Sequence, residues 1–181
     1  MGDSIELLAR VVWRVDGRVL VCRNRKRGYC FLPGGHVEFG ESAGAAAIRE
    51  LSEEAGLVIS LSPPTAVFEM TFRQQGRLRH EVTVVFHVAQ CNTEPSSVSS
   101  REPAIAFEWV EVDRLEVEGF VPRPQLEWLL APQAGGFGRV IVVANESIPD
   151  DYGSRDTGTT AEGGMWSDTT CPAAGNSVGF V

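Results

Sequence analysis

The sequence predicts an α/β protein in which a mixed β-sheet packs with one long central helix. Apolar runs of strand length alternate with turn residues, and a single long helical segment spans residues 42–55. Hydrophobic residues make up 43% of the 181 residues, which is enough for the core of one ordinary domain. Strands of this kind combined with one long helix are typical of an α/β sandwich.

Two β-hairpins are predicted. Residues 5–15 and 18–23 are rich in Leu and Val, and Asp16-Gly17 between them is a strong two-residue hairpin signal. The second hairpin pairs residues 65–73 with 78–89. The other expected elements are short strands at 58–62 and 105–112, a helix at 125–130, a polar loop at 91–101, and a last strand or docking segment at 138–144.

The central helix has recognisable ends. Ser42 is a good N-cap residue and Gly56 is a helix stop, so we expect a helix over residues 42–55 that packs through Ile48, Leu51 and Ala55. We expect small Ala46 and Ala47 to lie beside its carboxylates and to leave room for a ligand. Just before this helix, Pro33-Gly34-Gly35 is expected to end any strand.

The composition divides the chain after residue 144. Residues 1–144 carry the periodic apolar segments, whereas residues 145–181 are rich in Gly, Thr, Ser and Asp and have no apolar period. Such a composition cannot bury enough surface to offset the entropy of ordering. We therefore expect one domain over 1–144 and a disordered acidic tail over 145–181.

Charge and cysteine usage limit the partners. The net charge is −8, and residues 145–181 contribute six acidic residues and one basic residue to it, which argues against a nucleic-acid partner. The four cysteines form no CxxC pair, and Cys22 and Cys30 are expected to be buried thiols. No signal-peptide core or membrane-spanning run is present, so we expect a cytoplasmic protein without a membrane partner.

One segment carries chemistry. It reads Gly35, five residues, Glu41, seven residues, Arg49-Glu50-Leu51, one residue, Glu53-Glu54, one residue, Gly56-Leu57. On a helix, Glu50, Glu53 and Glu54 fall within an arc of about 100°. Clustered carboxylates repel one another, and a divalent cation reverses the sign of that interaction. Oxygen ligands alone point to Mg²⁺ or Mn²⁺.

This segment resembles the Nudix box, G-x5-E-x7-R-E-U-x-E-E-x-G-U with U aliphatic, at every fixed position. The resemblance implies a Nudix α/β/α sandwich that carries the box as a loop–helix–loop. It also implies an enzyme that uses Mg²⁺ or Mn²⁺ to direct water onto a phosphorus atom of a phosphoanhydride. By this resemblance Glu50, Glu53, Glu54 and the carbonyl of Gly35 are metal ligands, and Glu41 and Arg49 organise the box.

The resemblance leaves the general base open. Within the box the candidates are Glu50 and Glu53, and outside it Glu108, directly before Trp109, occupies a position similar to a metal-linked glutamate in some members. Glu81 and Glu102 are weaker candidates, which we interpret as exposed carboxylates. For the substrate phosphates we expect Arg23 and Arg73 as cationic partners, and Gly34 where the backbone approaches the ligand.

The substrate class is left partly open. The expected substrate is a small nucleotide in which a nucleoside diphosphate is linked to another group, either a (d)NTP or a nucleotide sugar. Downstream signatures of ADP-ribose and dinucleoside-polyphosphate enzymes are missing, since Thr71, Phe72 and Gln74 stand near those positions. A nucleotide sensor without turnover and an RNA 5′-end pyrophosphohydrolase are the alternatives, and a homodimer is left open.

Overall fold

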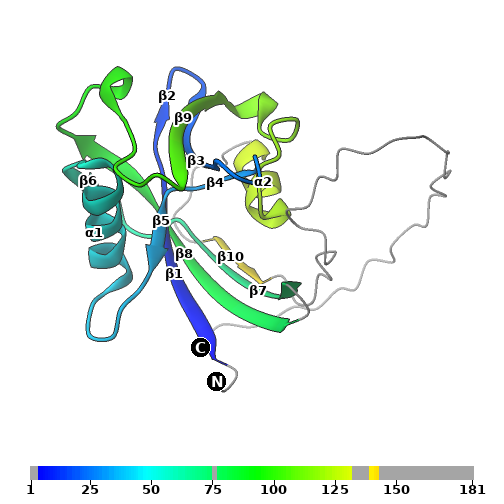
Figure 1. Cartoon of the computed structure of the whole chain (residues 1–181). Coiled ribbons are helices and arrows are strands. Elements are labelled where there is room, and N and C mark those ends of the chain that lie inside the picture. The colour runs from blue at the N-terminus through cyan, green and yellow to red at the C-terminus, as the bar shows by residue number, and fades with distance from the viewer. Residues whose placement is uncertain (1–3, 75–76, 132–138, 143–181) are drawn as a thin grey trace, which may run out of the picture.

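The computed structural model describes residues 4–74, 77–131 and 139–142, and it confirms the α/β class (Figure 1). Two helices are present in this part of the chain, α1 (Ala43–Ala55) and α2 (Arg123–Leu130), with short 3₁₀ turns at Pro95–Ser97 and Val112–Arg114. The strands are β1 (Ile5–Val12), β2 (Arg14–Val15), β3 (Arg18–Asn24), β4 (Cys30–Phe31), β5 (Gly34–His36), β6 (Ile59–Leu61), β7 (Ala66–Gln74), β8 (Arg77–Cys91), β9 (Ile105–Glu111) and β10 (Arg139–Val142). The expected tail over 145–181 lies outside the described residues.

The strands form two sheets. The larger has the order β10-β7-β8-β1-β5, with β6 added to β8, and the smaller has the order β2-β3-β4, with β9 added to β3. β1 runs parallel to β8 and β10 runs parallel to β7, whereas the other pairs are antiparallel. α1 and α2 lie on opposite sides of the larger sheet (Figure 1), so the predicted mixed sheet and sandwich are confirmed.

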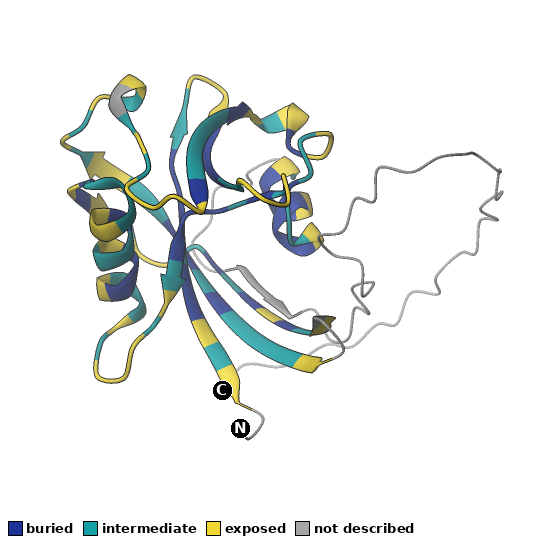
Figure 2. Ribbon diagram, viewed as in Figure 1, coloured by how far each residue is buried: buried dark blue, intermediate teal, exposed yellow. Residues whose placement is uncertain are grey.

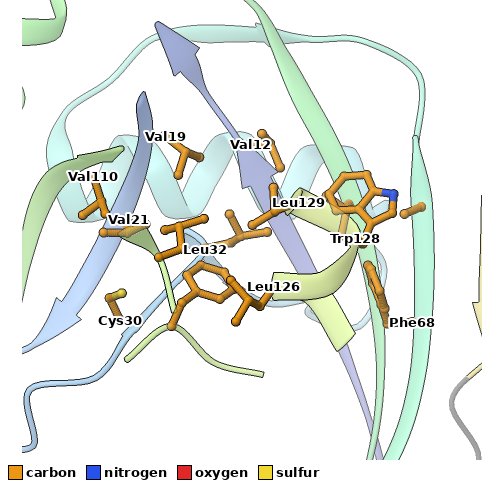
Figure 3. Packing of buried hydrophobic residues seen from close by; sticks show 14 of the residues in the cluster. Val12, Val19, Val21, Cys30, Leu32, Phe68, Val110, Leu126, Trp128 and Leu129 are labelled. Carbon is orange, nitrogen blue, oxygen red and sulfur yellow. The ribbon is translucent and has the colours of Figure 1, made fainter. Parts of the chain in front are cut away.

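Buried residues occur in both sheets and in both helices (Figure 2), and their apolar side chains form two cores. The first joins the two sheets and α2, and Phe68 meets Trp128 there edge to face with ring centroids 5.8 Å apart (Figure 3). The second lies under α1, where Leu51 is fully buried and Trp13 meets Trp109 at 5.2 Å. Each helix therefore fixes one face of the sandwich.

Both hairpin turns are confirmed, but the first hairpin is shorter than predicted, because only β2 pairs with β3 across it and β1 pairs with β8 and β5. Asp16 and Gly17 have φ values of 49° and 76°, the left-handed conformations that a tight two-residue turn requires. β7 and β8 pair in register from Ala66 opposite Val85 to Gln74 opposite Arg77. Cys22 and Cys30 are buried free thiols, as expected. Neither of the two described helices is long and apolar enough to cross a membrane.

β4 ends at Phe31, before Pro33, as expected, but the sequence prediction missed a new strand that begins at Gly34. Gly34–His36 forms β5, which pairs antiparallel with β1. Gly34 has φ +120°, and a Cβ atom there would collide with the carbonyl oxygen of Ala9. The glycine is needed because β5 approaches the backbone of β1 closely, and in this case it permits a strand where we expected an end.

The ends of α1 are as predicted, and Leu51 and Ala55 pack on the core as expected, whereas Ile48 does not. The Ser42 side chain accepts a hydrogen bond from the Ala45 amide, and Gly56 adopts φ 69° at the C-cap. Ala46 and Ala47 are fully buried and pack in the core under α1. Ile48 is 39% exposed, because the buried face follows Ala46, Ala47 and Leu51.

Candidate active site

Arg49 organises the loop before α1. Its Nη2 donates to Glu41 Oε1 at 2.8 Å and to the His36 carbonyl at 3.1 Å. Its Nη1 donates to Glu50 Oε1 at 3.0 Å and to Glu53 Oε2 at 3.2 Å. The hydrogen bond from Arg49 holds the pKa of Glu41 below its usual value, and the Glu41 hydrogen bond raises the pKa of Arg49. A single guanidinium therefore ties the loop, β5 and two helix carboxylates together.

Glu50 lies directly against the backbone of β5. A Cβ atom added to Gly35 would collide with the Glu50 carboxylate, so this carboxylate occupies the space that the glycine leaves. The Glu50 side chain is only 17% exposed, whereas that of Glu53 is 60% exposed. The box glycine and the first of the three box glutamates thus form one unit, with Glu53 at its solvent side.

Glu54 carries a buried carboxylate oxygen. Its Oε2 is buried and has no hydrogen-bond partner among the residues that the structure describes. Burial, followed by the nearby charge of Glu50, raises the pKa of Glu54 to about 7. An ionised carboxylate in such a place is costly unless a positive charge compensates it.

A cation is compatible with this arrangement, although the described side chains form no ready-made group of three or more metal ligands. Arg49 holds Glu50 and Glu53, so their oxygens must turn toward a bound ion. Glu54 Oε2 has no partner among the described residues, and the Glu50 carboxylate lies beside Gly35. These carboxylates supply hard oxygen donors on one side of α1. Such donors suit Mg²⁺ or Mn²⁺.

Arg23 and Glu108, predicted as separate site residues, lie together. Arg23 Nε donates to Glu108 Oε2 at 2.6 Å, and its Nη2 donates to Glu118 Oε2 at 2.9 Å. Arg23 Nη1 also donates to the Gly28 carbonyl at 2.7 Å. Both residues come from the smaller sheet, where β3 pairs with β9, and no hydrogen bond in the described part of the chain joins either of them to Glu50, Glu53 or Glu54.

The other predicted residues are spread more widely. Gly34 sits in β5, and its carbonyl accepts a hydrogen bond from Arg10. Arg73 is exposed on β7 and, by strand alternation, faces the side opposite Phe72. Glu102 is exposed, as expected. The interpretation of Glu81 as an exposed carboxylate was wrong, because Glu81 is half-buried on β8 and lines a cavity.

That cavity, here called the intersheet cavity, opens between the two sheets beside α2 and encloses about 180 Å³. Its lining is aromatic and aliphatic with a few polar groups, namely Leu8, Arg10, Tyr29, Phe31, Met70, Phe72, Glu81, Thr83, Val121, Pro122 and Gln125. A concave, mostly apolar space with few polar groups is the usual form of a small-ligand site.

The sequence prediction missed Arg10 and its place in the site. The guanidinium lies over the Phe31 ring, 5.2 Å from its centroid, and Nη1 donates to the Leu32 and Gly34 carbonyls. Burial lowers the pKa of Arg10, and Glu81, Glu54 and Glu50 act against that effect. Arg10 therefore connects the intersheet cavity with the backbone next to Gly35. The available signal was a charged residue between Leu8 and Val12 on the inward face of an apolar strand.

The two sheets, the helix packed on the larger one and the glutamates of its loop–helix–loop define a protein of the Nudix fold. The family model for the NUDIX domain matches residues 8–129. The chain therefore belongs to the Nudix hydrolase family and is a pyrophosphohydrolase.

Known relatives agree with this assignment. An uncharacterized Nudix hydrolase, YvcI of Bacillus subtilis, is 27% identical over 112 residues, which cover 62% of this chain and 70% of the relative. A MutT-like protein of Streptomyces ambofaciens is 29% identical over 108 residues, covering 60% of this chain and 64% of the relative. The crystal structure of a MutT protein from Bacillus halodurans matches with a TM-score of 0.57 at 21% identity, covering 68% of this chain and 79% of that one.

Proposed function

We propose that this enzyme uses Mg²⁺ or Mn²⁺ to hydrolyse a phosphoanhydride bond in a nucleoside diphosphate linked to another group, either a (d)NTP or a nucleotide sugar. The observation that carries the proposal is the placement of Glu50 and Glu54. One carboxylate fills the space beside Gly35, and the other has a buried oxygen without a hydrogen-bond partner in the described part of the chain. The unpartnered oxygen of Glu54 is costly in an isolated fold, and both carboxylates suit a bound cation.

Each residue of the box then has a role. Glu50, Glu53, Glu54 and the Gly35 carbonyl would hold the ion, which would neutralise phosphate charge and make the attacking water more acidic. Glu50 or Glu53 accepts the proton of the attacking water. Glu53 is 60% exposed, and Glu50 lies next to it on the same guanidinium of Arg49. Arg49 positions these carboxylates and does not itself touch the substrate.

The residues outside the box have secondary roles in this proposal. Glu108 serves as the base only if it leaves the ion pair with Arg23, so the box glutamates are preferred. Arg23 remains a proposed partner of the substrate phosphates. Gly34 packs against Ala9 of β1, and Arg73 lies on the face of β7 opposite Phe72, so we assign neither of them a contact inside the cavity. The intersheet cavity takes the nucleoside, because Phe31 and Phe72 offer ring faces there.

Two alternatives are tested by the same chemistry. A catalytically silent nucleotide sensor would bind nucleotides without turnover, although all three box glutamates are present. An RNA 5′-end pyrophosphohydrolase would act on triphosphorylated RNA, although the acidic balance of the chain disfavours nucleic acid.

We further propose that the enzyme is cytoplasmic and that residues 1–144 fold without the acidic segment 145–181. Loss of the fold on truncation after Ala144 would contradict the last point.

The proposal is tested with the full chain and a panel of (d)NTPs, nucleotide sugars, dinucleotides and 5′-triphosphorylated RNA, each with Mg²⁺ and with Mn²⁺. We expect metal-dependent release of a nucleoside monophosphate from at least one (d)NTP or nucleotide sugar, measured by chromatography, and loss of that release with EDTA. Turnover of nothing with either metal would reject the enzyme as proposed. Turnover of RNA alone would show that the substrate is 5′-triphosphorylated RNA and not a (d)NTP or a nucleotide sugar.

A further inference from the structure

The last turn of α1 carries two of the proposed metal ligands in an unfavourable place. Glu53 and Glu54 lie directly before the end of α1 at Ala55, and the last turn contains no basic residue. The carboxyl end of a helix has a partial negative charge and carbonyl groups without partners inside the helix, so negative side chains weaken it. Helix ends also fray. A cation and hydrogen-bond donors from another part of the chain would stabilise this turn.

Arg101, in the loop between β8 and β9, supplies both. Its Nη1 donates to the Ser52 carbonyl at 3.2 Å. Its backbone amide donates to the Glu54 carbonyl at 2.6 Å. These carbonyls lie on either side of Glu53, so one residue from outside the helix fixes the backbone of the turn that carries the two glutamates.

Gly56 makes room for the Arg101 guanidinium. A Cβ atom at Gly56 would collide with Nη2, Cζ and Nε of Arg101. The sequence prediction treated Gly56 only as a helix stop, and its φ of 69° agrees with that. The structure shows a second reason for the glycine, because the planar guanidinium packs on the backbone where a side chain would otherwise stand.

The loop that carries Arg101 stays close to the box in spite of electrostatic repulsion. Burial, then Glu50 and then Glu102, raises the pKa of Glu54, so the Glu102 carboxylate acts on the same side chain as the box does. The Ser100 hydroxyl donates to the Glu102 carbonyl at 2.9 Å and accepts from the Glu102 amide at 3.1 Å, which gives this part of the loop a defined shape. Like charges repel one another, and the hydrogen bonds from Arg101 to α1 oppose that repulsion.

We infer that Arg101 is a positioning residue of the metal site, which holds the last turn of α1 so that Glu53 and Glu54 are in place to bind the ion. Arg49 binds carboxylate oxygens of the box, whereas Arg101 acts on the backbone, and among the described residues its guanidinium donates to no carboxylate. Arg101 takes no part in the chemical step. This inference rests on the proposed function and adds to it a residue far along the chain from the box.

The inference is tested by Mn²⁺ binding to the full chain, followed by electron paramagnetic resonance without nucleotide. We expect Arg101→Ala to weaken Mn²⁺ binding about tenfold, the effect of losing a contact that orients metal ligands. Arg101→Lys keeps a donor for the Ser52 carbonyl, so we expect it to recover part of the affinity. The matched control is Arg18→Ala, which removes an exposed arginine at the start of β3 and should leave the affinity unchanged.

The sign of the effect separates positioning from simple electrostatics. Removal of a positive charge near a cation site should strengthen cation binding, so a loss of affinity in Arg101→Ala reports a change in the placement of the ligands. Amide hydrogen exchange without metal supplies the second measurement. We expect the amides of residues 53–57 to exchange faster in Arg101→Ala than in the wild-type protein, while the melting temperature changes little.

Failure of this inference differs from failure of the proposed function. Mn²⁺ affinity of folded Arg101→Ala that equals or exceeds that of the wild-type protein would overturn the inference and keep the proposed function. Unchanged hydrogen exchange would also overturn the inference, because Arg101 would then not act through the last turn of α1. Absence of Mn²⁺ binding by the wild-type protein would reject the metal site of the proposed function, and the inference with it.

Discussion

The box and the intersheet cavity are built in opposite ways. The box is one continuous segment, in which Gly35 contacts Glu50, and Arg49 binds Glu50 and Glu53 across a single loop and helix. The cavity is assembled from β1, β4, β7, β8 and α2, and neighbours such as Leu8 and Thr83 are far apart in the sequence. The comparison separates two tasks. The box determines the reaction. Residues of the intersheet cavity can change which ligand is bound without altering the box.

The largest expected effect is on the box side. Glu53→Gln removes a charged ligand and candidate base on the solvent side of α1, and we expect kcat to fall by about a hundredfold or more, with KM nearly unchanged. Steady-state kinetics with the best nucleotide of the panel measure this, and Glu111→Gln is the matched control. Near-normal kcat in a folded Glu53→Gln protein would remove Glu53 from the site.

Two adjacent glycines should separate activity from folding. Gly34→Ala forces a side chain into the Ala9 carbonyl at φ +120°, so we expect several degrees of lost thermal stability or failure to fold. The atoms nearest to a Cβ at Gly35 belong to the Glu50 carboxylate, the far end of a flexible side chain rather than backbone, so for Gly35→Ala we expect a near-native melting temperature and at least about a tenfold loss of kcat. Equal effects of the two changes on melting temperature would contradict the assignment of Gly35 to the site.

The buried face of α1 gives a stability test with an internal control. Leu51→Ala removes a fully buried side chain, and we expect the free energy of unfolding to fall by about 2–5 kcal/mol. Ile48→Ala changes a side chain that is 39% exposed on the same helix and should cost less than about 1.5 kcal/mol. Urea denaturation measures both values. If Ile48→Ala lowered the free energy of unfolding more than Leu51→Ala, Ile48 would lie on the packed face of α1, as expected from the sequence.

The smallest expected effect is on the pH dependence of stability and concerns His87, which contacts α2. His87 packs against Trp128 of α2 with ring centroids 6.0 Å apart, and burial, then Arg14, lowers its pKa. The unfolded chain therefore binds a proton more readily near pH 6.5, so this histidine favours the fold above that pH and loses the contribution as the pH falls through its lowered pKa. His87→Phe should reduce the drop in melting temperature between pH 7.5 and pH 5.5. Identical drops in both proteins would contradict this.

Much of the fold and all residues of the box could be predicted from the sequence because their signals are local. The Asp16-Gly17 turn, the Ser42 cap and the Gly56 stop act through neighbouring residues, and each is confirmed. The strand at Gly34–His36 could not be predicted in this way. The pairing that makes it a strand is with β1, about 25 residues earlier in the chain.

The cavity shows the same limit more clearly. Glu81 looks like an exposed strand carboxylate in the sequence, and its burial depends on β4 and α2 closing over β8. Arg10 interrupts an apolar run, but its stacking on Phe31 and its hydrogen bond to Gly34 require the folded sandwich. The pairing of Arg23 with Glu108 likewise depends on the register between β3 and β9. The burial and the partners of these residues therefore depend on long-range contacts, which is why they differ most from the sequence interpretation.

The metal assignment of the box is tested most directly by binding of Mn²⁺, followed by electron paramagnetic resonance on the full chain at neutral pH without nucleotide. We predict that the wild-type protein binds Mn²⁺ and that Glu54→Gln, which neutralises the buried carboxylate, weakens binding at least about tenfold while the melting temperature is retained. Mn²⁺ affinity that is equal in the wild-type protein and in the folded Glu54→Gln variant would contradict the account.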